Sequence, residues 1–226
     1  KRQGIFSLQR PLPATTVTDM QVISTNVAVR RPDPSGRHEF SGIDKRPQDF
    51  IDISAPGPNY GDGSGVRGDS IGDSEHHGGS DKAVYAYARE ELDYWEDSLG
   101  RTLGSGAFGE NLTTRGIDLS ALLINQRLHI GTATLEVSIP RQPCATFSGW
   151  VQEKGWLKRW TARGDCGVYF RVISPGRISA GDAIICGPAP AHDITMRMAF
   201  AAKMGDRALA RRVVDAKCLP CLLYTS

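Results

Sequence analysis

The sequence predicts a mainly β fold: a closed or nearly closed β-barrel with one embedded helix and a small helical extension at its C-terminal end. Three observations carry this prediction. The 226 residues include 25 Gly and 13 Pro, which favour many turns over a helical bundle. Several short segments alternate apolar and polar residues, as half-buried strands do. Two further segments place apolar residues at helical spacing.

Short strands are predicted along most of the chain. The first covers 21–29, a β-branched run that stops at Arg30-Arg31-Pro32. From 32 to 72 the chain is rich in Gly, Pro, Asp and Ser, which predicts loops and brief strands. The other predicted strands lie at 50–53, at 83–87, in a hairpin over 127–139 that bends at Gly131-Thr132, and at 167–173 and 181–186 with a turn at Pro175-Gly176 between them.

Two helices are predicted. The first covers 88–99, before Gly100. The second follows Gly187-Pro188, and we expect Asp193 to cap it. We therefore divide the chain into a barrel domain at 1–190, with its core motifs at 66–187, and a short helical extension at 191–226. The apolar residues at helical spacing are Leu92, Trp95 and Leu99 in the first helix, and Met196, Phe200 and Met204 in the second.

Composition excludes several classes of function. The chain carries 27 Lys plus Arg against 25 Asp plus Glu, a net charge of +2, so we expect no nucleic-acid partner and no membrane partner. No apolar run is long enough to span a bilayer, and no apolar signal core follows the basic N-terminal residues. Five cysteines without a disulfide framework leave at least one free thiol. These features indicate a cytoplasmic location.

Cys144 is the strongest candidate for a reactive cysteine. Pro140 and Pro143 hold the preceding backbone extended, and the nearby cation of Arg141 favours the nucleophilic, metal-binding thiolate. Cys166 precedes a predicted strand and Cys186 ends one, so both are expected to be small buried residues. The pair Cys218 and Cys221 lacks the second pair or the histidines of a zinc site, and we interpret it as structural.

The segment His76-His77-Gly78-Gly79-Ser80-Asp81-Lys82 is a second candidate. Neighbouring side chains on an extended chain point to opposite faces, so the two histidines are poor co-ligands for one zinc ion. The segment is either an ordinary turn or a site for an anionic ligand. In the second case, a histidine, the amides of Gly78 and Gly79 and the ammonium of Lys82 would surround the anion.

A third candidate is the Gly-rich loop at 104–114. It lacks the Gly-Lys-Ser/Thr ending of a P-loop and the strand–loop–helix setting of a dinucleotide site. Glu110 could carry a proton or bind ligand N–H groups. Alternatively, Glu110 and Asn111 satisfy backbone groups of a turn. The local sequence leaves both interpretations open.

Taken together, these segments resemble the MOSC domain family, whose name-giving relatives include the C-terminal domain of molybdenum cofactor sulfurase. The likeness is greatest to its YiiM-like branch of stand-alone bacterial proteins and covers roughly 20–190. It rests on Gly68-Asp69, His76-His77-Gly78-Gly79-Ser80-Asp81-Lys82-Ala83-Val84, Gly106-Ala107-Phe108-Gly109-Glu110-Asn111-Leu112-Thr113-Thr114 and Arg141-Gln142-Pro143-Cys144. The branch usually has a Gln and an acidic residue before the histidines, whereas this chain reads Ser70-Ile71-Gly72-Asp73-Ser74-Glu75, where Asp73 could supply the acidic group.

The resemblance implies a β-barrel that binds the molybdenum cofactor (molybdopterin), with Cys144 as the molybdenum ligand. It further implies an oxidoreductase that reduces small N-hydroxylated compounds, in which Cys144 acts with Glu110 or His77 as proton donor. A soft thiolate suits a thiophilic metal, and glycine amides and cations suit the phosphate of a pterin. By matched position, His76, His77, Gly78, Gly79 and Lys82 would line the pocket, Glu110, Asn111 and Thr113 would face it, and Arg141 would lie beside the metal ligand.

Electrons would have to come from a separate reductase, because no segment resembles a flavin, nicotinamide or iron–sulfur site. The alternatives are a non-catalytic module that binds the cofactor or carries a persulfide on Cys144, and a barrel without a cofactor. Pyridoxal phosphate on Lys82 is not expected, because another domain carries that cofactor in the sulfurases. The sequence leaves the oligomeric state open.

Overall fold

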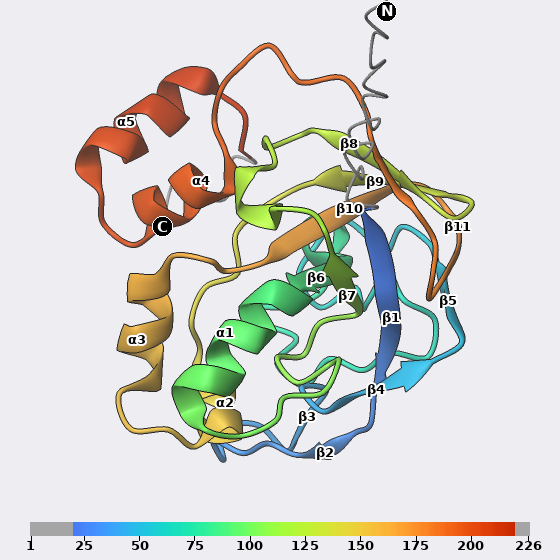
Figure 1. Ribbon diagram of the computed structural model, residues 1–226, viewed down its shortest axis with the longest axis vertical. Helices are drawn as coiled ribbons and strands as arrows, with labels where there is room; N and C mark the ends of the chain where they lie inside the picture. The colour runs from blue at the N-terminus through green and yellow to red at the C-terminus, as the bar shows by residue number, and fades with distance from the viewer. Residues whose placement is uncertain (1–19, 220–226) are drawn as a thin grey trace, which may run out of the picture.

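One curled sheet forms the body of the molecule (Figure 1). The computed structural model describes residues 20–219. Their strands are β1 (Gln21–Ala28), β2 (Arg31–Pro32), β3 (Phe40–Ser41), β4 (Lys45–Gln48), β5 (Phe50–Ile53), β6 (Val84–Ala88), β7 (Leu112–Arg115), β8 (Arg127–Ile130), β9 (Ala133–Val137), β10 (Val168–Ser174), β11 (Gly176–Ser179) and β12 (Ile184–Cys186). The large sheet has the order β12-β8-β9-β10-β6-β7-β1-β4, in which only β6 and β7 are parallel. Two small sheets pair β5 with β11 and β2 with β3.

Hydrogen bonds between distant parts of the large sheet bring it close to a barrel. Near the start of β1, Val22 donates its N–H to the carbonyl of Asp182 at 2.9 Å and accepts from the N–H of Gly181 at 2.7 Å. The N–H of Ile184 in β12 donates to the carbonyl of Met20 at 2.7 Å. The sheet therefore curls until β1 meets the chain that enters β12. The predicted mainly β, nearly closed barrel is confirmed.

Helices cover one side of this barrel and extend it at the C-terminal end (Figure 1). They are α1 (Arg89–Leu99), α2 (Ala145–Val151), α3 (Trp156–Arg163), α4 (Met196–Lys203) and α5 (Arg207–Ala216), with short 3₁₀ turns η1 (Ser80–Lys82) and η2 (Leu119–Ala121). Gly100 ends α1 in the left-handed conformation. Within residues 20–219, none of the helices has the length and apolar character needed to cross a membrane.

Most predicted elements are present, and several were missed. β1, β5, β6, β8, β9, β10, β12 and α1 lie where the periodicity placed them. One embedded helix was expected, but α2 and α3 follow α1 before β10. The predicted turn at Pro175-Gly176 leads directly into β11, and β7 continues the Gly-rich loop as a strand. Each missed element has at most eight residues, too few to establish a clear period.

The expected cap of α4 was wrong. Thr195, two residues beyond Asp193, accepts the N–H of Met198 at 3.2 Å, whereas Asp193 pairs with Arg212 of α5 at 2.7 Å. The prediction for the C-terminal cysteines is tested in part. Cys218 is buried and free, and Cys221 lies outside the described residues.

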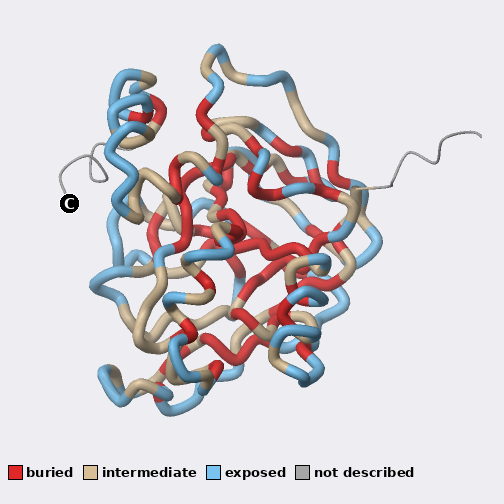
Figure 2. The backbone as a smooth tube through the Cα atoms, turned by 60° about the vertical axis from the view of Figure 1, so that its left-hand side comes forward, coloured by how far each residue is buried: buried red, intermediate tan, exposed pale blue. Residues whose placement is uncertain are grey.

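Aromatic rings hold the helices against the barrel. Trp156 of α3 lies 4.6 Å from Trp95 of α1 and 5.4 Å from both Phe108 and Phe147, measured between ring centroids. Trp160 continues the contacts to α4. Figure 2 shows the buried segments in the interior and the exposed ones along the outer helices and loops. The edge-to-face contacts among these aromatic rings stabilise the folded protein by more than the burial of their area alone. The cluster therefore fixes the helices that flank residues 140–146.

We expect Trp156→Ala to lower the free energy of unfolding by about 3–5 kcal/mol, because it empties a site that is 1% exposed. Chemical denaturation followed by circular dichroism measures this change. Val214→Ala on α5, where the side chain is 51% exposed, is the matched control and should change stability by less than about 0.5 kcal/mol. Equal effects of the two substitutions would contradict the role given to the cluster.

Candidate functional site

A cavity opens where the loops before β4, β6 and α2 meet. It contains about 710 Å³ of free space, including its mouth. Its walls come from segments far apart in the sequence, which only the folded barrel brings together. The lining residues are His38, Phe40–Ile43 and Lys45, then Ser64, Asp69–Asp73, His77, Gly78, Lys82 and Tyr85, then Gly109, Asn111, Arg141, Cys144, Thr146 and Tyr169.

Cys144 lies in this cavity as a free thiol. Its backbone is extended, with φ −134° and ψ 164°, as is usual for the residue that caps a helix, and it caps the N-terminus of α2. Its Sγ accepts the N–H of Phe147 at 3.4 Å. The side chain is half-buried, so it is held in place and still faces the cavity.

Arg141 places a buried cation in the same wall. Its Nη1 donates to the carbonyl of Phe108, and its guanidinium lies 4.2 Å from the ring centroid of Phe147 and 4.8 Å from that of Tyr85. Burial disfavours the charged form, but the surrounding groups, Tyr85 foremost, raise the pKa of Arg141 above its usual range. The guanidinium therefore stays charged beside the cavity.

The carboxylate of Asp69 holds the cavity floor. It accepts the ammonium of Lys45 at 2.5 and 2.6 Å, the amide of Asn111 at 2.9 Å, the N–H of Ala28 at 2.9 Å and the hydroxyl of Ser64 at 3.1 Å. Burial by itself would raise the pKa of Asp69, but the charge of Lys45 and the hydrogen bonds from Lys45, Asn111 and Ala28 together hold that pKa below its usual value. The opposite charges of Lys45 and Asp69 therefore neutralise each other in a buried ion pair. Either charge alone would be costly to bury.

The histidine pair divides between the cavity and solvent. His77 lines the cavity, and its Nδ1 lies 3.3 Å from Asp73 Oδ2 without hydrogen-bond geometry. Burial lowers the pKa of His77 to about 4, and the nearby Lys82 acts in the same direction. His77 is therefore neutral at pH 7. His76 was expected in the pocket, but its side chain is 67% exposed and lies outside it, because the chain turns there rather than running extended.

Lys82 is the second cation of the cavity. Its ammonium donates to the carbonyl of His76 and lies 4.6 Å from the ring centroid of Tyr60. Burial lowers the pKa of Lys82 to about 8, although Asp73 and Cys144 oppose that shift. It is charged at neutral pH and close to titrating. Among the described residues, neither Lys82 nor Arg141 forms an ion pair with a carboxylate within 4.0 Å.

Glu110 does not face the cavity, contrary to expectation. It is 0% exposed, and its carboxylate accepts the N–H of Gly106 at 2.6 Å, the N–H of Phe108 at 3.0 Å and the hydroxyl of Thr113 at 2.9 Å. Burial raises the pKa of Glu110. The interpretation in which Glu110 satisfies turn groups is correct. Thr113 also lies outside the cavity, because its hydroxyl is shared between Glu110 and Asn26.

The two glycines after the histidines have different surroundings. Gly78 lines the cavity, with φ +82°. Gly79 was expected there too, but it packs against the loop at 59–60, where an added Cβ would lie 2.2 Å from the carbonyl oxygen of Asn59. The structure thus gathers His77, Gly78, Lys82, Asn111, Arg141 and Cys144 from the predicted set, and it leaves out His76, Gly79, Glu110 and Thr113.

Several cavity residues gave no signal in the sequence. Lys45 sits between Asp44 and Arg46 like any surface lysine, yet its side chain is 8% exposed. In the sequence, Tyr85 and Tyr169 resemble ordinary strand residues. They line the same wall of the cavity because they are direct partners across β6 and β10. Asp69 stood out only as part of a short Gly-Asp match.

The donor set favours an anion that brings most of its own metal ligands. Among residues 20–219, no group of three or more His, Cys, Asp or Glu side chains could hold a bare metal ion. The cavity instead offers one thiol, Cys144, with the cations of Arg141 and Lys82, the neutral imidazole of His77 and the carboxylate of Asp73. A single soft ligand next to positive charge fits a thiophilic metal carried by an anionic cofactor.

Two curated relatives align with part of the chain. The "Uncharacterized protein YflK" of Bacillus subtilis (strain 168) is 40% identical over 115 residues, 51% of this chain and 52% of the relative. "Protein YiiM" of Escherichia coli (strain K12) is 31% identical over 140 residues, 61% of this chain and 62% of the relative. The aligned part thus spans about half to three fifths of these relatives.

Solved structures agree over most of the chain. YiiM from Geobacillus stearothermophilus has a TM-score of 0.70 and 26% identity, covering 90% of this chain and 95% of that one. YiiM from Escherichia coli, at 22% identity with a TM-score of 0.64 and coverage of 91% and 87%, shares the fold. The family model for the MOSC domain matches residues 73–185, half of the 226 residues. The chain belongs to the MOSC domain family.

Proposed function

We propose that this protein binds the molybdenum cofactor in the cavity, with Cys144 as a thiolate ligand of the metal, and reduces N-hydroxylated small molecules with electrons from a separate reductase. The MOSC domain family is associated with molybdenum-cofactor binding. The observation that carries the proposal is the pairing in one cavity of the Cys144 thiol with two cations, Arg141 and Lys82, that lack carboxylate partners among the described residues. An anionic ligand would balance their charge.

Each cavity group has a distinct part in this proposal. Cys144 would bind the metal, with the permanent charge of Arg141 in the same wall, and Lys82 and the Gly78 backbone would attract the anionic part of the cofactor. The compensated Lys45–Asp69 pair keeps the floor rigid and positions Asn111. When bound, the molybdenum centre would supply the change of oxidation state. His77, neutral at pH 7, is available as a hydrogen-bond partner for a substrate.

In the proposed reaction, a hydroxylamino compound takes up two electrons and two protons and yields the amine and water. We do not assign these protons to Glu110, because its carboxylate is buried and accepts hydrogen bonds from Gly106, Phe108 and Thr113. Lys82 and solvent at the cavity mouth remain as sources. General acid catalysis requires a donor within hydrogen-bond reach of the leaving oxygen, which a buried Glu110 would not meet.

Protein produced in cells that make the cofactor should convert hydroxylamino substrates to amines when a chemical or enzymatic reductant is supplied. Product formation measured by mass spectrometry tests this. Bound molybdenum without turnover would reject the reductase proposal. A labile sulfur adduct on Cys144 without turnover would support the persulfide carrier instead.

Cys144→Ala should lower the bound molybdenum by more than roughly tenfold, because the substitution removes the thiolate from the ligand set. Elemental analysis of the purified protein measures this loss. Cys186→Ala removes a half-buried thiol outside the cavity lining and should leave the metal content unchanged. Normal molybdenum in Cys144→Ala would exclude this residue as the ligand.

Anion binding should weaken as the pH rises through about 8, because the pKa of Lys82 lies there and the ammonium loses its charge above it. Calorimetry with sulfate, whose charge is constant in this range, should show roughly tenfold weaker binding at high pH. Lys82→Arg should remove most of this dependence, and Lys158→Arg on α3 should not. An unchanged pH profile in Lys82→Arg would contradict the role of Lys82.

A further inference from the structure

Five tyrosine and tryptophan rings form a line from the cavity to the outer surface of α1. Tyr169 and Tyr85 both line the cavity and are direct partners across β10 and β6, with ring centroids 4.9 Å apart. Tyr87 follows two residues later in β6, 6.4 Å from Tyr85. The indole N–H of Trp95 donates to the Tyr87 hydroxyl at 3.2 Å, and the Trp95 ring lies 5.0 Å from that of Tyr94, which is 42% exposed.

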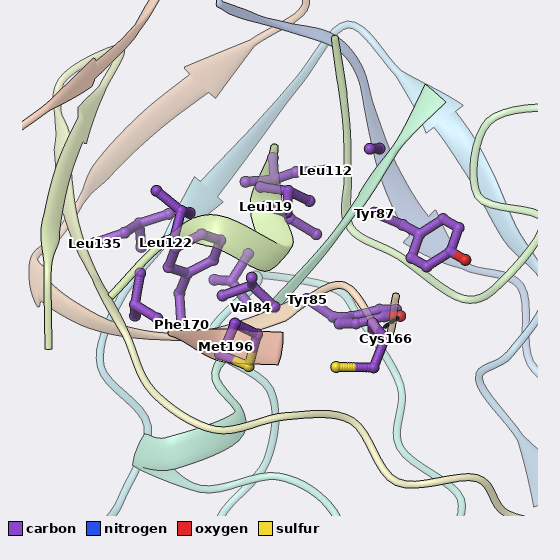
Figure 3. Packing of buried hydrophobic residues seen from close by; sticks show 14 of the residues in the cluster. Val84, Tyr85, Tyr87, Leu112, Leu119, Leu122, Leu135, Cys166, Phe170 and Met196 are labelled. Carbon is purple, nitrogen blue, oxygen red and sulfur yellow. Dashed lines mark hydrogen bonds between the residues drawn. The ribbon is translucent and has the colours of Figure 1, made fainter. Parts of the chain in front are cut away.

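Packing alone does not account for the hydroxyls in this line. Tyr85 donates to the carbonyl of Cys166 at 2.8 Å, and Tyr87 donates to the carbonyl of Asp165 at 3.3 Å, so both buried hydroxyls needed partners. Figure 3 shows Tyr85 beside Cys166. A phenylalanine would fill the same space without that requirement. Phe108, next to Tyr87 at 5.2 Å, shows that the core accepts plain rings there. Tyrosine and tryptophan differ from phenylalanine in giving up an electron readily.

We propose that Tyr169, Tyr85, Tyr87, Trp95 and Tyr94 carry oxidising equivalents from the cavity to solvent. A one-electron oxidant formed in the cavity, such as a radical derived from peroxide, takes an electron from the inner tyrosines and is itself reduced. Each oxidised ring then takes an electron from the next ring along the line, so the electron hole moves outward to Tyr94. Tyr94 finally loses one electron and releases its hydroxyl proton to water, and a dissolved reductant such as ascorbate later returns both an electron and a proton.

Two arginines favour movement in this direction. The buried guanidinium of Arg141 lies 4.8 Å from the centroid of Tyr85, which makes positive charge on that ring unfavourable. Around Trp95, the guanidinium of Arg159 lies farther away, 5.9 Å from the ring centroid. At the outer end, Arg163 lies 4.0 Å from the centroid of Tyr94 and favours loss of its proton over retention of positive charge. The line therefore drains the cavity and spares Cys144 from oxidation.

This inference rests on the proposed function only for the natural source of the oxidant, since redox chemistry in the cavity would generate one. Its test needs no molybdenum. A ruthenium polypyridyl dye is attached to Cys144, confirmed by peptide mapping, and is oxidised by a light flash with an irreversible electron acceptor. A nitroso spin trap then marks the radicals, and mass spectrometry locates the adducts. The route and the reductase activity can thus fail independently.

We expect most of the adduct on Tyr94. Trp95→Phe should lower the yield of the Tyr94 adduct by roughly tenfold, because a modestly higher barrier at one electron-transfer step has an effect of this size. The adduct should then form on Tyr169 and Tyr85 instead. Tyr87→Phe keeps the ring and removes only the hydroxyl, and it should also lower the yield of the Tyr94 adduct. This variant provides the test if Trp95→Phe fails to fold. Trp160→Phe changes a buried tryptophan off the line and should have no effect.

Two results would overturn the proposal. An unchanged Tyr94 adduct in both Trp95→Phe and Tyr87→Phe would show that Tyr94 is oxidised from solution. Adducts confined to Tyr60, which is 36% exposed and close to Lys82, would show that the oxidising equivalent leaves through the cavity mouth.

Discussion

The buried carboxylate of Asp69 is the interaction on which the cavity depends. Its donors come from the end of β1, the start of β4, the loop at Ser64 and the residue before β7, so one side chain ties together four segments distant in sequence. Lys45 compensates its charge, and the remaining donors satisfy its lone pairs. Removing Lys45 would leave the buried charge of Asp69 unpaired, and removing another donor would leave part of its carboxylate without a hydrogen bond. The floor of the cavity is therefore fixed before any ligand arrives.

Above this neutral floor, the cavity holds two cations, Arg141 and Lys82, and one further carboxylate, Asp73, whose pKa lies below its usual value because nearby histidines outweigh the effect of burial. Arg141 is held charged by its surroundings, Lys82 is charged at neutral pH, and His77 is kept neutral by burial. Cys144 lies among them at the start of α2, whose position depends on the aromatic cluster of α1 and α3. The net charge of +2 for the whole chain conceals this local field. Binding an anion here requires only the few groups that line the cavity.

Features with local causes could be predicted from the sequence. The hairpin of β8 and β9 follows from the alternation of apolar residues, and the helix α1 follows from helical periodicity and the glycine that ends it. Features that depend on residues far apart in the sequence could not be predicted in this way. Lys45 and Asp69 are 24 residues apart, and no pattern marks either as buried. Glu110 turned inward because the folded loop aims the amides of Gly106 and Phe108 at its carboxylate, which its side-chain chemistry alone did not reveal.

We propose above all that this preformed cavity holds molybdenum through Cys144. A crystal structure of protein purified with its cofactor, with an anomalous difference map recorded at the molybdenum absorption edge, tests it most directly. We expect an anomalous peak within bonding distance of Cys144 Sγ, with the Lys45–Asp69 pair intact beneath it. A molybdenum peak elsewhere on the protein, or one in the cavity without a bond to Cys144, would contradict it.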